Sequence, residues 1–209
     1  MGRKELAICV GFFYFLSSGT LGADLIYYRD GERNISEYEG EIQKGDLEKF
    51  ESILRSHEYI TEVRLSSPGG LIYEAFEISK FLRNNNIASR VSKGKNCFSA
   101  CFDIFIGGII RSIEAGAKLG SHMHSLPIDT LVSEMRKKYD KIKDKRLLFY
   151  LIVKDTEQQS ALATAKRFKN LIDMGVDYRA LNPLIATHTL REYYFDRHEM
   201  EYFNIINSD

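Results

Sequence analysis

One serine in this sequence is well suited to nucleophilic chemistry. Ser99 lies among small and apolar neighbours, after the turn-forming Gly94 and before an apolar run that ends at Gly107 and Gly108. The pattern predicts a helix that begins near Ser99, where packing would hold the hydroxyl group and the free N–H groups of the first turn would stabilise negative charge. The alternative is that Ser99 only caps this helix, as serine commonly does.

Two further segments could complete an acyl-transfer site. Residues 67–70 (Ser-Pro-Gly-Gly) would expose backbone N–H groups at the start of a helix, and His122 follows another glycine-bearing turn. Acyl transfer needs a nucleophile, a base and N–H donors for the oxyanion, and the three segments supply these parts. His124 lies two residues after His122, so on a strand both histidines would face the same side and could reach the site.

The elements expected around these segments alternate between strands and helices. Short apolar segments predict strands at 25–29, 34–39, 59–65, 87–91 and 109–113, and apolar stripes at helical spacing predict helices at 46–56 and 71–84. This alternation favours parallel β-α-β units with right-handed connections. Sites in such sheets gather at the carboxyl ends of the strands, where the three glycine-bearing turns are expected.

The region after Pro127 is expected to be mainly helical. Its apolar spacing predicts a long helix over 131–155, a second over 158–174 and a shorter one around 178–188. The tail from 192 to 206 is expected to add a strand and a small helix. These helices separate the histidines from the C-terminal residues by a long stretch of sequence.

Composition limits the classes of protein to consider. The chain has 209 residues, 29 basic and 29 acidic side chains and an apolar share of 44%. Balanced charge gives no indication of a nucleic-acid or acidic-membrane partner, and residues 24–209 are expected to form one domain. Residues 1–23 combine Arg3 and Lys4, a short apolar run and a small-residue zone, as in an export signal cleaved after Gly22 or Ala23. The alternative is an uncleaved membrane anchor.

Two cysteines flank Ser99. Cys97 and Cys101 remain after removal of the signal, and export would permit a disulfide between them. On one helix, their Cβ atoms would be about 5–6 Å apart, which is too far for the usual disulfide geometry. A disulfide becomes feasible if Cys97 lies in the turn before the helix, and otherwise both are packing residues.

Taken in order, these segments resemble the ClpP/crotonase superfamily. The resemblance rests on Ser-Pro-Gly-Gly before a helix, on Ser99 in a small-residue helix start, and on the Gly-x-His segment that ends at His122. The sequence is most similar to the exported ClpP-like serine proteases of bacteria, which carry a similar Cys-x-Ser-Ala-Cys segment. The similarity covers residues 35–125 well and 187–206 loosely. It implies an α/β fold of repeated β-β-α units with a largely parallel sheet and a helical C-terminal portion.

The resemblance also implies roles for individual residues. Ser99 would be the nucleophile and His122 the general base, while Gly69 or Gly70 together with the N–H of Ala100 would form the oxyanion hole. No cofactor and no metal is expected, since no carboxylate or cysteine lies at zinc-ligand spacing from the histidines. A Ser-Lys dyad with Lys93, Lys95 or Lys118 is an alternative that the match of His122 disfavours.

The third catalytic residue is the weakest match to the family. The segment 194–200 resembles the family's C-terminal turn, which places the acidic position at Glu192 rather than at the usual aspartate. Asp173, Asp177 and Asp196 compete for this role. The alternative for each is a solvated carboxylate on a helix or turn.

The sequence therefore predicts a serine endopeptidase that is exported to the bacterial periplasm and acts on a peptide or protein substrate, with no nucleic-acid partner. A homo-oligomer is expected by analogy with ClpP, and membrane attachment only if residues 1–23 stay uncleaved. One alternative is an inactive binding or scaffold protein with the same fold. The other is a crotonase-type acyl-CoA enzyme, which export disfavours because CoA esters are cytoplasmic.

Overall fold

The computed structural model describes residues 22–56, 59–123, 128–187 and 191–208. Its larger sheet has the order β1-β2-β3-β4-β6. The strands are β1 (Asp24–Asp30), β2 (Arg33–Glu39), β3 (Glu62–Ser66), β4 (Ala88–Val91) and β6 (Arg111–Ile113). Only the β1–β2 pair of this sheet is antiparallel. A mixed α/β fold with a mostly parallel sheet is thus confirmed, and the repeat of β-β-α units stays a prediction.

A smaller sheet brings together segments that are far apart in the sequence. It consists of β5 (Asn96–Cys97), β7 (Lys118–Ser121) and β8 (Tyr193–Tyr194), in the order β5-β7-β8. β5 and β7 are parallel, whereas β7 and β8 are antiparallel. The residues before and after these short strands include most of the predicted site.

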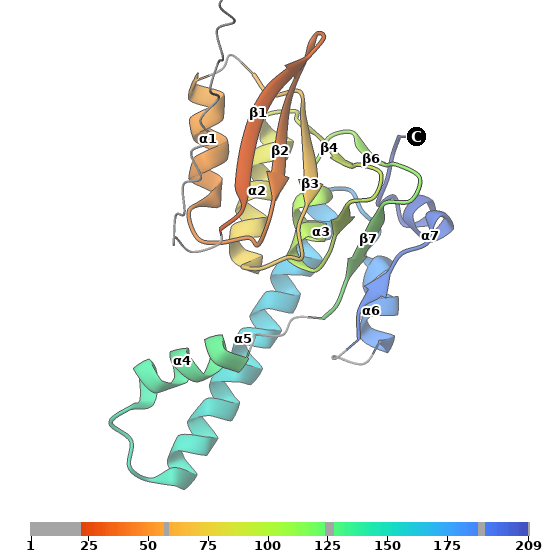
Figure 1. The fold of residues 1–209 in the computed structure, drawn as a ribbon. Coiled ribbons are helices and arrows are strands. Elements are labelled where there is room, and N and C mark those ends of the chain that lie inside the picture. The colour runs from red at the N-terminus through yellow and green to blue at the C-terminus, as the bar shows by residue number, and fades with distance from the viewer. Residues whose placement is uncertain (1–21, 57–58, 124–127, 188–190, 209) are drawn as a thin grey trace, which may run out of the picture.

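One face of the larger sheet packs against helices. In Figure 1, α2 (Ile72–Asn84) and α3 (Ala100–Phe105) lie behind the strands, and α1 (Asp46–Ser56) lies to the left of β1. Side chains alternate along β3, so Val63 and Leu65 are buried in the apolar core. Helix α3 lies deepest, with all six of its residues buried.

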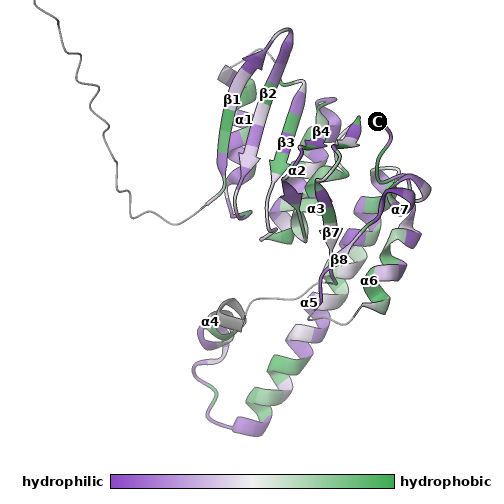
Figure 2. Cartoon of the chain, turned by 45° about the vertical axis from the view of Figure 1, so that its right-hand side comes forward, coloured by the Kyte–Doolittle hydropathy of each residue, from purple (hydrophilic) through white to green (hydrophobic). Residues whose placement is uncertain are grey.

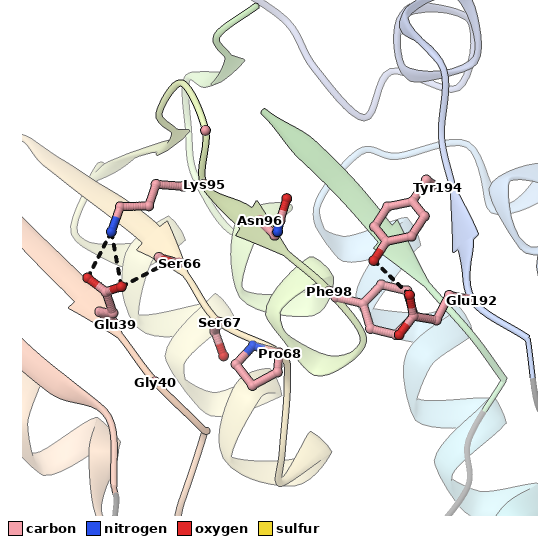
Figure 3. A pocket seen from close by; sticks show the side chains of 11 residues that line it. Glu39, Gly40, Ser66, Ser67, Pro68, Lys95, Asn96, Phe98, Glu192 and Tyr194 are labelled. Atoms are coloured by element: carbon pink, nitrogen blue, oxygen red, sulfur yellow. Dashed lines mark hydrogen bonds and ion pairs between the residues drawn. The ribbon is translucent and has the colours of Figure 1, made fainter. Parts of the chain in front are cut away.

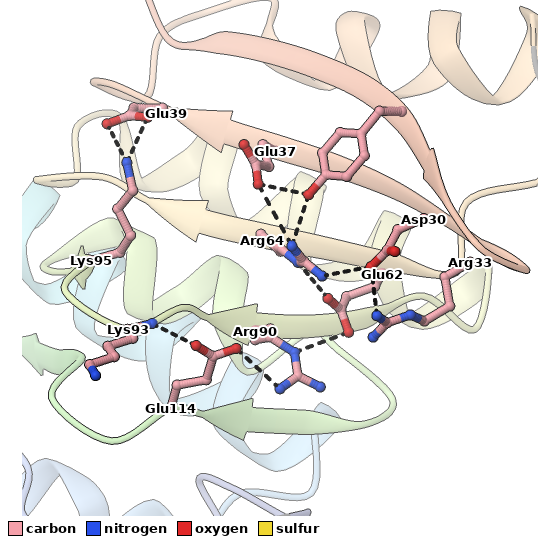
Figure 4. Close-up of polar contacts among 11 residues, drawn as sticks. Asp30, Arg33, Glu37, Glu39, Glu62, Arg64, Arg90, Lys93, Lys95 and Glu114 are labelled. Carbon is pink, nitrogen blue, oxygen red and sulfur yellow. Dashed lines mark hydrogen bonds and ion pairs between the residues drawn. The ribbon is translucent and has the colours of Figure 1, made fainter.

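The opposite face of the sheet carries a network of ion pairs (Figure 4). Arg64 and Arg90 both contact Glu62, at 2.9 and 3.1 Å, and Arg90 also lies 3.6 Å from Glu114. Glu62 itself is buried, and the two arginines are partly exposed to solvent. The main effect of these ion pairs is to keep this face polar, so the apolar core forms on the helical side.

The helical region differs from the expected one. It contains α4 (Ile128–Tyr139) and the continuous α5 (Lys145–Asp173), so the break lies at residues 140–144 and not between 155 and 158. Asp144 explains this position, because its side chain caps α5 by accepting from the N–H groups of Arg146 and Leu147. The prediction of one helix over 131–155 was therefore wrong.

Helix α4 and the first half of α5 project from the body as a hairpin (Figures 1 and 2). Only the second half of α5 packs against the body, through Ala163, Arg167, Asn170 and Leu171. Apolar residues occur along the projecting half, where Phe149 is 70% exposed. No helix in the described part of the chain has the length and apolar character needed to span a membrane.

The C-terminal region returns the chain to the body. It contains a 3-10 turn η1 (Tyr178–Leu181), α6 (Asn182–Ala186), β8 and α7 (Arg197–Tyr202). The third expected helix, around 178–188, is thus divided into η1 and α6, and residues 188–190 lie outside the described ones. The expected strand and small helix of the tail correspond to β8 and α7.

Candidate active site

Ser99 occupies a sharp turn between β5 and α3. Its backbone dihedral angles are φ 58° and ψ −122°, in a region that residues other than glycine rarely adopt. Holding a serine there costs on the order of 1–3 kcal/mol, and such strain gathers at functional sites. A strained turn from strand to helix is also how some hydrolases present a nucleophilic serine.

The hydroxyl group of Ser99 is not used for capping. Ser99 stands at the N-cap position of α3, but its side chain makes no capping hydrogen bond. No described residue hydrogen-bonds its Oγ atom, and the residue is partly exposed. Its backbone N–H donates to the Gly120 carbonyl oxygen at 3.1 Å, which fixes the turn against β7. These features favour a reactive hydroxyl over a simple helix cap.

A disulfide closes the turn. Cys97 lies in β5 and Cys101 in α3, with Cα atoms 5.2 Å apart and their sulfur atoms bonded. Because Cys97 lies in a strand before the helix, the geometry that would forbid a disulfide within one helix does not apply. Both cysteines are fully buried, so they link the strand and the helix on either side of Ser99 inside the core.

Gly69 is the backbone neighbour that lets this turn form. Its φ is 106°, and a Cβ atom placed on it would come within 2.6 Å of the Ser99 Cβ atom and 3.0 Å of the Ala100 nitrogen. Backbone atoms cannot move aside as a flexible side chain can. Only glycine fits at this position beside the nucleophile.

The predicted oxyanion-hole residues lie close to Ser99, and their N–H groups differ in availability. The N–H of Gly69 donates to Ser67 Oγ at 3.1 Å. No described residue accepts a hydrogen bond from the N–H groups of Gly70 or Ala100. Of the two glycines, Gly70 therefore has the donor available for an oxyanion, together with Ala100.

His122 lies immediately after β7, beside the Ser99 turn. Its ring packs on the Phe98 ring, with centroids 5.4 Å apart. The ladder places the two segments side by side, because β7 pairs with β5 and Gly120 accepts from the N–H of Ser99. Among the described residues, no hydrogen bond joins Ser99 Oγ to the His122 ring; such contacts are often long before substrate binds. His124 lies outside the described residues.

The tautomer of His122 follows from its hydrogen bond. Its Nδ1 atom lies 2.6 Å from the carbonyl oxygen of Met123. Because a carbonyl oxygen can only accept, Nδ1 must carry the proton, and in the neutral ring Nε2 is then free to accept. This is the tautomer that a general base needs, and here a backbone carbonyl supports it rather than a carboxylate.

Glu192 is placed near His122 by strand register but is bonded elsewhere. Ser121 pairs with Tyr193, so one step further along this antiparallel ladder brings Glu192 opposite His122. The Glu192 side chain is exposed and accepts from the Tyr194 hydroxyl group at 2.8 Å. No described contact joins its carboxylate to the histidine ring, so the structure brings the two backbones together but not the two side chains.

The competing carboxylates have other partners. Asp173 forms an exposed ion pair with Lys169 at 2.6 Å, and Asp177 caps η1. Asp196 caps α7 and forms a capping box with Glu199. Arg179 holds the pKa of Asp177 below its usual range, mainly through a side-chain hydrogen bond. All three carboxylates therefore have structural roles in turns or helices.

The lysines of the alternative dyad do not contact Ser99 in the described structure. Lys95 pairs with Glu39 at 3.0 Å, and the Lys118 ammonium group lies over the Tyr194 ring at 5.6 Å. The described residues likewise contain no group of three histidine, cysteine or acidic side chains that could hold a metal ion. Among the described candidate bases, His122 is the residue whose side chain lies next to the Ser99 turn.

A groove of about 660 Å³ runs beside the Ser99 turn. Figure 3 shows the Glu39–Lys95 ion pair at one end, Glu192 and Tyr194 at the other, and Phe98 and Pro68 between them. Ser99 is not among the residues that line it, although Phe98 and Pro68 are neighbours of the turn in sequence and space. The groove could hold an extended segment of a ligand next to the hydroxyl group.

Sequence reasoning missed two buried residues near the site. Asp103 is completely buried in α3, and Arg167 of α5 contacts both oxygens of its carboxylate. Burial raises the pKa of the Asp103 carboxyl group, and the Arg167 guanidinium group opposes that rise. The detectable signal was a single charge inside the apolar run 102–106, because a buried charge needs a partner.

Comparisons with known proteins are informative at the level of structure. No protein-family model matches the sequence, and no curated protein is similar to it in sequence. Among solved structures, the chain is similar to a mutant of ClpP1 from Listeria monocytogenes, with a TM-score of 0.51 and 15% identity over 83% of this chain and 89% of that one. The chain has a ClpP-like fold. At this identity the ClpP-like fold is what the similarity shows, so the roles of Ser99 and His122 depend on the geometry above.

Proposed function

We propose that this chain is an exported serine endopeptidase with a ClpP-like fold and Ser99 as its nucleophile. The observation that carries the proposal is the Ser99 turn, with a strained backbone and an Oγ atom free of described hydrogen bonds. A serine that only capped α3 would need neither feature. The adjacent N–H groups and the histidine supply the other parts of an acyl-transfer site.

The proposed reaction follows from these positions. Ser99 Oγ attacks the peptide carbonyl carbon, and His122 Nε2 accepts the hydroxyl proton. The N–H groups of Ala100 and Gly70 stabilise the oxyanion of the tetrahedral intermediate. His122 then donates the proton to the leaving amine, and water releases the acyl group by the reverse sequence of proton transfers.

Glu192 is proposed as the third residue of the site. Its place opposite His122 in the ladder supports the role, because rotation of its side chain away from Tyr194 would bring the carboxylate toward the ring. A carboxylate there would stabilise the imidazolium ion formed during the reaction. In its present position it lines the groove instead.

A second candidate function is an inactive binding protein with the same fold. Two observations favour it: no described hydrogen bond joins Ser99 Oγ to His122, and the carboxylate of Glu192 bonds to Tyr194. In that case the groove would bind a peptide segment without cleaving it. The two functions share the fold and differ in the reactivity of Ser99.

A fluorophosphonate probe separates these functions. We expect the probe to label the wild-type protein and to leave Ser99→Ala unlabelled, with His122→Ala labelled at least 1000-fold more slowly, since a base of this kind is worth on the order of 10³-fold or more. Ser121→Ala is the matched control, because its hydroxyl group lies near the same turn but has no proposed role. A folded wild-type protein that the probe does not label would exclude the hydrolase.

Export to an oxidising compartment, such as the bacterial periplasm, is part of the proposal. The Cys97–Cys101 disulfide supports it, because disulfides persist mainly outside the cytosol. Ala23 is buried and its N–H donates to the Glu41 carbonyl oxygen at 3.1 Å, which favours signal cleavage after Gly22 over cleavage after Ala23. Residues 1–21, which hold most of the proposed signal, lie outside the described ones. N-terminal sequencing of the secreted protein would locate the cut.

A homo-oligomer is also proposed. The hairpin of α4 and α5 leaves Phe149 and Tyr150 largely exposed, and exposed apolar side chains of this size gather at protein interfaces. Light scattering coupled to size-exclusion chromatography should give a mass of at least two chains, and Phe149→Glu should reduce it. A monomeric wild-type protein would contradict this part of the proposal.

A further inference from the structure

We propose that the buried Asp103–Arg167 pair is a positioning unit that holds His122 relative to Ser99. This inference rests on the proposed function, since it concerns the same site. Three elements meet at the pair: α3, which begins after Ser99; α5; and the segment after β7 that carries His122. The pair is built entirely from residues that sequence reasoning had not assigned.

The pair is isolated from solvent. The Asp103 side chain is 0% exposed and the Arg167 side chain 4%. Arg167 Nε lies 3.0 Å from Asp103 Oδ1, and its Nη2 atom contacts Oδ2. Buried pairs of this kind add little stability compared with apolar residues of the same shape, so a stabilising role alone does not account for it.

Arg167 has one further donor group that reaches the His122 segment. Its Nη1 atom donates to the backbone carbonyl oxygen of His122 at 2.7 Å. The rigid guanidinium group therefore fixes the His122 backbone to the same helix that begins after Ser99. Nucleophile and base are joined through one planar group that has little freedom to move.

The orientation of the histidine ring depends on the same backbone. Because the His122 carbonyl group is held, the peptide group that joins His122 to Met123 is held too. The carbonyl oxygen of Met123 lies 2.6 Å from Nδ1 of the His122 ring. The Phe98 ring supports the imidazole from its side. Arg167 thus acts through the backbone to select the tautomer with a free Nε2 atom, a task that a carboxylate performs in the Ser-His-Asp arrangement.

The test replaces both members of the pair together. Asp103→Leu with Arg167→Met keeps the shapes and avoids a buried unpaired charge, so the variant should fold with a melting temperature near that of the wild type. Lys169→Met with Asp173→Leu is the matched control, because it removes an exposed ion pair from the same helix α5.

Two measurements are made on these proteins. Fluorophosphonate acylation should slow by about 10- to 100-fold in the buried-pair variant and stay within about twofold in the control, as expected for a misplaced catalytic group. In ¹⁵N NMR spectra of the His122 ring, assigned with His122→Ala, the wild type should show protonated Nδ1 and the buried-pair variant a mixture of tautomers. A merely structural pair would leave the ring spectrum unchanged.

Equal acylation rates and identical ring spectra in the wild type and the folded buried-pair variant would overturn the inference while leaving the hydrolase intact. If the probe labels neither protein, the proposed function fails, and the ring spectra alone then decide whether the pair positions His122. A tautomer change that accompanies slower acylation supports both.

Discussion

The Ser99 turn and the Glu192 segment meet at the same small sheet but are held in different ways. The turn is fixed by a disulfide, by close contact with Gly69 and by the hydrogen bond from Ser99 to Gly120. Glu192 precedes a strand of two residues, and one hydrogen bond from Tyr194 holds its exposed carboxylate. The backbone thus fixes the position of the Ser99 hydroxyl group, whereas the Glu192 carboxylate lies at the end of a side chain that can rotate.

This difference indicates where substitutions should matter. At the Ser99 turn, a change in the backbone alters the position of the hydroxyl group, the backbone strain and the packing against Gly69 together, because the same few atoms determine all three. At the Glu192 segment, a side-chain change should affect one hydrogen bond at a time. Substitutions at the Ser99 turn should therefore have larger effects than substitutions at the Glu192 segment.

Gly69→Ala should have the largest effect. Its Cβ atom would lie 2.6 Å from the Ser99 Cβ atom, and φ 106° is unfavourable for alanine. We expect a loss of about 2–4 kcal/mol in the free energy of unfolding and at least a 100-fold slower acylation by fluorophosphonate.

Gly94→Ala is the control for this variant. Gly94 also has a positive φ, of 77°, but a Cβ atom there would meet nothing within 4 Å. The Gly94→Ala variant should lose stability from backbone strain alone, and its acylation rate should stay within about threefold of the wild-type rate. Equal loss of acylation in both variants would show that the contact with Ser99 is unimportant.

Removal of the disulfide should have the next largest effect. Cys97→Ala with Cys101→Ala opens a loop of five residues, for which chain entropy predicts a loss of about 2 kcal/mol. Urea denaturation would measure it, and the wild type in reducing buffer should shift toward the same midpoint. Unchanged midpoints in both would mean that the disulfide does not restrain the turn.

Asp196→Ala should lower the free energy of unfolding by less than removal of the disulfide does. It removes the N-cap and the capping box of α7, which lowers the free energy of unfolding by about 1 kcal/mol. Acylation should stay within about twofold, because the Asp196 carboxylate bonds to the N–H of Glu199 in α7, which has no role in the proposed site. A large fall in acylation without a loss of stability would instead assign Asp196 to the site.

Tyr194→Phe should have the smallest effect, in the opposite direction. It removes the hydroxyl group that holds the Glu192 carboxylate, leaving the side chain free to rotate toward His122. We expect acylation to rise by about threefold, within the net worth of one hydrogen bond. The rise should vanish in Tyr194→Phe combined with Glu192→Gln, and its persistence there would remove Glu192 from the proposed site.

The fold could be predicted from the sequence where local patterns were strong. The helices at 46–56 and 71–84 agree with α1 and α2 to within a residue, because their apolar stripes have helical spacing throughout. The helix expected after Ser99 is α3. The boundary between α4 and α5 was misplaced because apolar periodicity continues on both sides of it, and only the cap at Asp144 marks it.

The site could be predicted only in part, for a physical reason. Ser99, Gly69, Gly70 and His122 follow strands in the sequence, so topology alone brings them together. The Asp103–Arg167 contact spans 64 residues and depends on how α5 packs, which no local pattern reveals. The position of the Glu192 carboxylate depends on a rotamer, and the sequence does not determine rotamers.

The backbone conformation at Ser99 also affects how such a sequence can change during evolution. Glycine adopts a φ of 58° readily, so Ser99→Gly would relieve about 1–3 kcal/mol of strain. Most substitutions destabilise a protein, which makes a stabilising one easy to fix once chemistry is no longer selected. In lineages where activity is no longer selected, we therefore expect glycine to replace serine at this position. A lineage that keeps serine there retains a residue that lowers the stability of the protein.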